Sequence, residues 1–218
     1  MKKTKKTVLE NASSKSIQFP DDEARFPWLA MLLDAYAIID DGIVAAIKKK
    51  GSGSSVRLSC SKGCDNCCRT HSDIPVYPLE LVGIYWFSIE KILPPDREIL
   101  KNRLSGHLKG EPCPFIVSGS CSIHPLRPIA CRQFNVFNRP CKEGEDPYYT
   151  RREDVLTPIQ DYTDRAFSTM LPFYGITDEA DKKRAIKDNL IHTQVRILQT
   201  CNWKELGRRM DDFDSAIK

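Results

Sequence analysis

Eight of the nine cysteines of this 218-residue chain fall into two blocks, and their spacing constrains the fold more than any other feature. The first block is Cys60-x3-Cys64-x2-Cys67-Cys68, and the second contains Cys113, Cys121, Cys131 and Cys141. Spacings of two or three residues let two thiolates reach one metal from a single loop, as in zinc and iron–sulfur sites. Sulfurs of the second block would complete the coordination from elsewhere in the fold. The pattern predicts that these eight cysteines bind metal.

A disulfide framework is the alternative for so many cysteines, and the compartment decides between the two. Residues 1–7 are basic, but residues 8–16 lack the apolar region of a secretory signal, and no stretch is apolar enough to cross a membrane. We therefore expect a cytoplasmic protein whose cysteines stay reduced. In that setting, metal binding explains the cysteines better than disulfides.

The net charge of +4 is carried by residues 1–16, and the remaining chain is formally neutral. The folded body therefore has no overall field that would steer it to phosphates. We expect residues 1–16 to form a disordered basic leader. No nucleic-acid partner is expected for the folded body and no membrane partner for the chain, whereas a protein substrate or partner stays open.

Apolar residues at helical spacing predict a long helix over residues 26–50, followed by a Gly/Ser linker. Further helices are expected over 78–92, over 95–108, from Thr157-Pro158 to about 171, from about 177 to about 200, and from 202 to about 216. Residues 113–141 are rich in proline and glycine, so they predict loops and a hairpin at Ser118-Gly119-Ser120. Their order is expected to come from ligation.

These elements predict a mainly α fold, a single helical domain around an irregular, cysteine-rich metal-binding core with one small hairpin. Its parts are the leader (1–16), an N-terminal helix and linker (17–54), the cysteine-cluster core (55–142) and a C-terminal helical part of the same domain (143–218). The helices supply a hydrophobic core that does not depend on metal for every contact.

Cys67 and Cys68 are neighbours, and adjacent side chains in extended backbone point in opposite directions. Eight thiolates therefore suit two four-sulfur sites, or one cluster beside a second metal or a reactive pair. Four thiolates on Zn²⁺ leave a net negative charge that needs donors nearby. Arg127 and Arg132 are candidates for that role, as are Arg69 and Arg139, for which an ordinary surface position is an equal alternative.

The cysteine motifs lie within about residues 55–142. They are Cys60-x3-Cys64-x2-Cys67-Cys68, Cys113-Pro114-Phe115-Ile116, Cys121-Ser122-Ile123-His124, Arg127-Pro128-x2-Cys131-Arg132-x-Phe134 and Cys141. They closely resemble the YkgJ-type cysteine-cluster family, a group of zinc- or iron-chelating domains related to flagellin lysine N-methylases. The resemblance implies that the eight cysteines are ligands or near-ligands and that Arg127 and Arg132 belong to the same core. The family often has Tyr where this chain has His124, which implies a structural histidine rather than a ligand.

The sequence thus predicts a protein that binds an iron–sulfur cluster, in preference to zinc, through Cys thiolates. Whether it is an enzyme stays open. As an enzyme it would be a cluster-dependent group-transfer catalyst, like a protein-lysine methylase, as the resemblance implies. The alternative is a non-enzymatic module in which metal stabilises an interaction or senses redox state. Cys201 lies on an apolar helical stripe and is expected to be a small buried hydrophobe, not a ligand.

Overall fold

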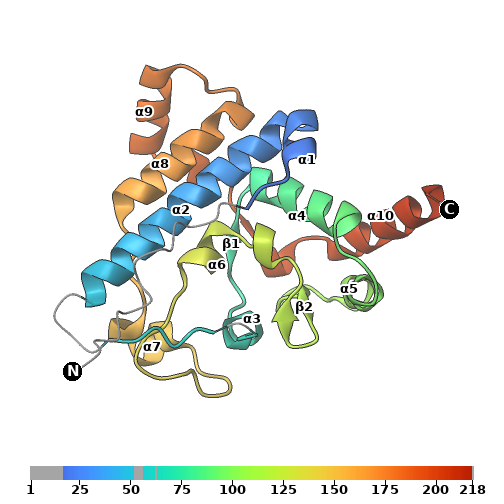
Figure 1. Cartoon of the computed structure of the whole chain (residues 1–218), viewed down its shortest axis with the longest axis horizontal. Helices are drawn as coiled ribbons and strands as arrows, with labels where there is room; N and C mark the ends of the chain where they lie inside the picture. Colours follow the sequence, from blue (N-terminus) through green and yellow to red (C-terminus); the bar gives the residue numbers. More distant parts are fainter. Residues whose placement is uncertain (1–16, 52–55, 62, 218) are drawn as a thin grey trace, which may run out of the picture.

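The computed structural model describes residues 17–51, 56–61 and 63–217, and it is mainly helical, as predicted (Figure 1). Its helices are α1 (Pro20–Arg25), α2 (Pro27–Gly51), α3 (Asn66–Thr70), α4 (Pro78–Glu90), α5 (Asp96–Gly106), α6 (Ile129–Gln133), α7 (Pro147–Thr150), α8 (Gln160–Met170), α9 (Glu179–Lys187) and α10 (Trp203–Ala216). Four two-residue strands complete it: β1 (Pro75–Val76), β2 (Ile116–Val117), β3 (Ser120–Cys121) and β4 (Arg196–Ile197). The expected basic leader lies outside the described residues.

Two groups of long helices build the body (Figure 1). In the first, α2 and α8 run side by side along their lengths. Their close approach depends on Gly42, where an added Cβ atom would lie only 2.6 Å from the Cβ atom of Tyr162. In the second group, α10 packs against α4 and α5. The cysteine segments lie beneath these helices, in the lower half of the view.

The helices predicted over 26–50, 78–92, 95–108 and 202–216 are confirmed as α2, α4, α5 and α10, with ends that differ by one or two residues. The hairpin predicted at Ser118-Gly119-Ser120 is also confirmed, as β2 and β3. Positive φ angles of 50° at Ser118 and 73° at Gly119 form its tight turn, a conformation that glycine adopts readily. These elements were recognisable because their signals are local.

Two further predicted helices are present as α8 and α9, but each prediction was wrong at one end. The helix expected to open at Thr157-Pro158 begins at Gln160, because Val155 forms a bridge with Val136 and the Leu156 nitrogen donates to the Asn135 carbonyl, which keeps this stretch extended. The helix expected to reach residue 200 ends at Lys187. Asn189 there adopts a left-handed conformation with φ 54°, which stops the helix, and residues 190–200 form short 3-10 turns around β4.

The strand β4 pairs antiparallel with β1, which lies a few residues after the first cysteine block. This pairing brings Gln199, whose side chain is fully buried, against the chain that leaves α3. The Gln199 side chain accepts a hydrogen bond from the Ile74 nitrogen at 3.2 Å and donates one to the His71 carbonyl at 2.8 Å. A distant segment thus fixes the exit of the first cysteine block.

The hydrophobic core runs from the long helices into the second cysteine block. Phe115, Ile123 and Ile129 are almost completely buried in it, and the ring of Phe115 lies 4.8 Å from that of Trp203 on α10. The block is therefore ordered in part by burial, and not by ligation alone as the sequence suggested. Among the helices of the described residues, none is long and apolar enough to cross a membrane.

Candidate metal centre

The first cysteine block is held at its start by backbone pairing with the segment that precedes Cys141. Leu58 forms a bridge with Phe137, and the Ser59 nitrogen donates to the Val136 carbonyl at 2.8 Å. The Val136 nitrogen in turn donates to the Cys60 sulfur at 3.3 Å. This backbone contact fixes Cys60 independently of any ligand.

The short helix α3 carries Cys67 and Cys68, and the second block is attached directly to it. The Cys113 nitrogen donates to the Cys68 carbonyl at 3.0 Å, and the neighbouring Cys113 side chain raises the pKa of Cys68. Cys121 then lies on β3 of the hairpin, and Cys131 lies on α6. Regular elements therefore position two of the four second-block sulfurs.

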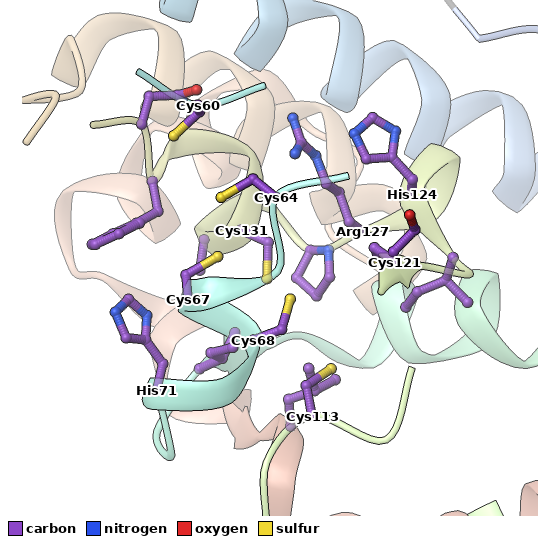
Figure 2. Close-up of a pocket in the computed structure, with 18 of the residues that line it drawn as sticks. Cys60, Cys64, Cys67, Cys68, His71, Cys113, Cys121, His124, Arg127 and Cys131 are labelled. Atoms are coloured by element: carbon purple, nitrogen blue, oxygen red, sulfur yellow. The ribbon is translucent and has the colours of Figure 1, made fainter. Parts of the chain in front are cut away.

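Seven of the eight predicted ligands line one cavity of about 1130 Å³ (Figure 2). They are Cys60, Cys64, Cys67, Cys68, Cys113, Cys121 and Cys131. Cys141 is not part of this lining, and Cys201 also lies elsewhere, where its thiol donates to the Ile197 carbonyl at 3.5 Å. The fold thus separates Cys201 from the other cysteines, although sequence reasoning placed it on a helix that does not exist.

The donor set of the cavity suits a thiophilic metal, because thiolates are the preferred ligands of zinc and of iron–sulfur clusters. The side chains are nevertheless not drawn together. Within the described part of the chain, no three His, Cys, Asp or Glu side chains are close enough to hold one ion where they stand. Ligation would therefore need the sulfurs to move towards one another within the cavity.

As arranged, the cavity favours neutral thiols. Burial raises the pKa of Cys60, Cys121 and Cys131, and the charge of neighbouring thiolates raises it further. The pKa of Cys67 is raised first by its hydrogen bond to Cys68 and then by burial, and that of Cys68 first by its hydrogen bond to Cys113. Buried thiols such as these give up their protons only to a strong positive charge, and a bound metal supplies one.

The two arginines predicted to serve the centre occupy different positions. Arg127 lines the cavity, and its charge lowers the pKa of Cys60 and Cys121 against the effect of burial. Its Nε atom is buried and, among the described residues, has no hydrogen-bond partner, so a donor faces this region unused. An anionic thiolate centre would satisfy it. This is the cavity feature that best fits the predicted role.

Arg132 lies outside the lining of the cavity. Its guanidinium binds the Asp40 carboxylate at 3.0 Å, stacks 4.0 Å above the ring of Tyr36, and donates to the Arg127 and Pro125 carbonyls. Arg132 therefore ties α6 to α2, and a contact with a bound group stays a prediction. The other two candidate arginines have exposed side chains. Arg69 forms an ion pair with Asp65, and Arg139 forms one with Glu145.

Sequence reasoning missed Arg151, which lies beside Cys141. Its side chain is 4% exposed and forms ion pairs with Glu145 and Asp154. Its Nη2 atom donates to the Cys141 sulfur at 3.7 Å. Burial raises the pKa of Cys141, whereas the charge of Arg151 lowers it. No local sequence signal marks this arginine, because it lies beyond the cysteine blocks.

His71 was also missed. It belongs to no histidine pair, and the cysteines that precede it already formed a complete motif without it. It lines the cavity three residues after Cys68, and its ring stands 4.4 Å from that of Phe134. Its Nε2 atom lies 3.3 Å from a carboxylate oxygen of Asp146, without the geometry of a hydrogen bond. Its position three residues after Cys68, directly beyond the end of α3, was the available clue.

His124 lines the cavity next to Arg127, in the 3-10 turn that follows the hairpin (Figure 2). Burial lowers its pKa, and the charges of Arg127 and Arg132 lower it further. The histidine is therefore held neutral. That it is structural and not a ligand stays a prediction.

The site so described is a cysteine-lined cavity with the donors of a metal-chelating domain. Residues 59–156 match the model of the CxxCxxCC family, whose description is "Putative zinc- or iron-chelating domain". This match confirms the cysteine-cluster resemblance over residues 59–156, somewhat less than half of the chain. No curated protein and no solved structure matches the chain.

Proposed function

We propose that residues 59–156 bind a metal centre through Cys thiolates, and that this centre is an iron–sulfur cluster in preference to zinc. The observation that carries the proposal is the convergence of cysteines from distant parts of the chain on one cavity. The unpartnered Arg127 Nε atom supports an anionic centre there. When bound, such a centre would supply either a redox couple or a Lewis acid.

The size of the cavity favours a cluster over a single ion. A zinc ion held by four sulfurs has Zn–S bonds of about 2.3 Å and leaves little space between its ligands. A cavity of about 1130 Å³ offers room for iron and sulfide besides the thiolates. Because thiolate ligation suits both, metal analysis must decide between them.

The test is metal analysis of protein purified without oxygen. We expect iron, acid-labile sulfide and visible absorbance in the wild type, their loss in Cys67→Ser, and their retention in Cys201→Ser, the matched control outside the cavity. Zinc without iron would overturn the preference for a cluster and keep thiolate ligation. Full-length protein with no thiolate-bound metal would overturn the proposal.

The cavity leaves space for a second molecule, which favours a group-transfer enzyme that resembles a protein-lysine methylase. Besides cysteines, the cavity is lined by Asp73, Asp146, Tyr148 and Tyr149. Carboxylates and tyrosine rings bind cationic groups. In the reaction, a methyl group would pass from the sulfonium of S-adenosylmethionine to a lysine amine of a protein substrate, and the amine would lose one proton.

The rival function is a non-enzymatic module in the cytoplasm that contacts a partner protein or senses redox state, and the exposure of Cys64 to solvent supports it. Binding of S-adenosylmethionine to metal-loaded protein, measured by calorimetry, separates the two. Binding that is lost on adding an excess of its demethylated product supports the enzyme. Absence of binding supports the module.

A further inference from the structure

We infer that the eight clustered cysteines form two groups of four, divided between the neighbours Cys67 and Cys68, and that each group holds its own metal centre. The inference rests on the proposed function, in which these thiolates bind metal. The outer group is Cys60, Cys64, Cys67 and Cys141. The inner group is Cys68, Cys113, Cys121 and Cys131.

The outer group is assembled by the pairing of residues 57–59 with residues 136–138. This pairing includes a hydrogen bond of 2.8 Å from the Asn138 nitrogen to the Arg57 carbonyl, and Cys141 follows three residues later. The Asn66 side chain, at the start of α3, donates to the Glu145 carbonyl at 2.8 Å. The segment that carries Cys141 is thus attached on both sides to the loop that carries the first three cysteines.

The sulfur charges that act on Cys141 come from the outer group, whereas Cys67 acts on both groups, on Cys60 and also on Cys121 and Cys131. The charges of Cys60 and Cys64 act on Cys141, and those of Cys64 and Cys67 act on Cys60. The backbone pairing of residues 57–59 with residues 136–138 therefore places Cys141 beside the first loop.

The inner group is built around the attachment of Cys113 to Cys68. The Cys113 nitrogen donates to the Cys68 carbonyl at 3.0 Å, and the charges of Cys113 and Cys121 both act on Cys68. Cys131 in turn feels the charges of Cys68 and Cys121. Cys67 acts on Cys131 as well and hydrogen-bonds to Cys68, so the two groups meet at Cys67.

The helix α3 explains why neighbouring cysteines can serve different centres. Successive residues of an α-helix are about 100° apart around its axis, so their side chains leave in different directions. In Figure 2, Cys60 and Cys64 lie above Cys67, whereas Cys113 lies below Cys68. Cys68 is therefore assigned to the inner group, and Cys67 is assigned to the outer group with Cys60 and Cys64 of the same loop.

The two groups also differ in access to solvent. Cys64 of the outer group is exposed, whereas Cys113 of the inner group is 4% exposed and lies in the main core. A chelator reaches an exposed site more readily than a buried one. We therefore expect metal to leave the outer group first and the inner group only in a second, slower phase.

The test uses full-length protein, stripped of metal under reducing conditions and reloaded without oxygen with Zn²⁺ alone. The wild type and Cys201→Ser should each bind about two tightly held Zn²⁺ ions per chain. Cys64→Ser, Cys141→Ser and the double variant Cys64→Ser/Cys141→Ser should each retain about one. The cross-group variant Cys64→Ser/Cys113→Ser should retain none. Circular dichroism confirms that each variant is folded.

The fast phase of metal release to a chelator should disappear in Cys64→Ser and persist in Cys131→Ser. Loss of all tight binding in Cys64→Ser, or a loss in Cys64→Ser/Cys141→Ser as great as in the cross-group variant, would overturn the division into these groups. A folded wild type that binds no Zn²⁺ through its thiolates would instead overturn the proposed function itself.

Discussion

The carboxylate of Glu80 accepts a hydrogen bond of 2.7 Å from the backbone nitrogen of Ile129, the first residue of α6. Its other oxygen accepts from the Tyr77 nitrogen at 2.9 Å and closes the N-terminus of α4. Glu80 is fully buried, and the hydroxyl of Tyr36 on α2 also lies against it. One side chain thus joins three helices, including the one that carries Cys131.

Replacing Glu80 with Gln should therefore destabilise the fold. The amide nitrogen of Gln cannot accept, so one buried backbone N–H would lose its partner, at a cost of about 1–3 kcal/mol. Chemical denaturation at about pH 5 measures the free energy of unfolding. Glu98→Gln, on the exposed face of α5, is the control and should leave it unchanged. Equal effects of the two variants would contradict this role of Glu80.

Glu80 should also make stability depend on pH. Burial raises its pKa to about 7, although its hydrogen bonds act in the opposite direction. Because the folded-state pKa lies above the ordinary value of 4.5, the folded protein retains a proton that the unfolded chain has already lost. The stabilisation is present below about pH 4.5 and is lost as pH rises towards 7, by roughly 3 kcal/mol in all.

The measurement is the free energy of unfolding of wild type and Glu80→Gln across this pH window. The difference between them should shrink as pH rises, because only the wild type has the carboxyl that ionises. A difference that stays constant from about pH 4.5 to 7 would mean that Glu80 does not titrate there.

Arg151 and Arg139 offer a comparison of buried and exposed partners of one carboxylate. Both pair with the same Glu145 oxygen, at 2.9 Å and 3.2 Å, but the arginine side chains are 4% and 50% exposed. Arg151→Ala would remove one donor each from Glu145, Asp154 and the Phe137 carbonyl, and with it the buried cation that the two carboxylates share. We expect it to lower the melting temperature by roughly 5–10 °C, and Arg139→Ala to change it little. Similar shifts would show that burial of the pair has no effect.

The contact between α2 and α8 should be sensitive at Gly42. A methyl group there would overlap the side chain of Tyr162, so Gly42→Ala should destabilise the protein by about 1–3 kcal/mol despite the better helix propensity of alanine. Gly51→Ala on the same helix meets nothing within 4 Å and is the matched control. Thermal unfolding of the two variants checks the difference, and a neutral Gly42→Ala would imply that the helices can separate freely.

Metal removal should loosen the cysteine loops and leave most helices intact. The long helices pack against one another through their own apolar faces, so their core persists without ligation. Hydrogen exchange of metal-loaded and metal-free protein should show lost protection around residues 57–70 and 136–146, with α2 and α8 unchanged. Loss across all helices would mean that the whole fold depends on metal.

The elements that could be predicted from the sequence are those with local signals. The apolar spacing of residues 26–50 predicted α2, and Ser118-Gly119 predicted the hairpin turn. The pairing of Pro75 with Ile197 joins residues far apart in the chain, and no local pattern marks it. The prediction that the helix opening near residue 177 continues to residue 200 was wrong because residues 196–197 pair with β1 instead.

The candidate site divides in the same way. Spacing selected eight cysteines, of which seven line one cavity, and the need of thiolates for donors together with the family resemblance pointed to Arg127, which lines it as well. It did not identify Arg151, whose position beside Cys141 depends on the turn that folds residues 145–154 back on themselves. The contact of Glu80 with Ile129 was likewise hidden, because it joins residues that are 49 positions apart in the chain.

The packing of Phe115 against Trp203 has a consequence for how the cysteine segment can be used. Residues 59–156 match a family model by themselves, yet Phe115 within them is covered by α10, which begins 47 residues after that segment ends. Excising the segment at those boundaries would expose Phe115 and remove Tyr36 from Glu80. The helix α10 contributes no sulfur to the cavity, but it packs against the segment that carries the inner cysteines and supports their position.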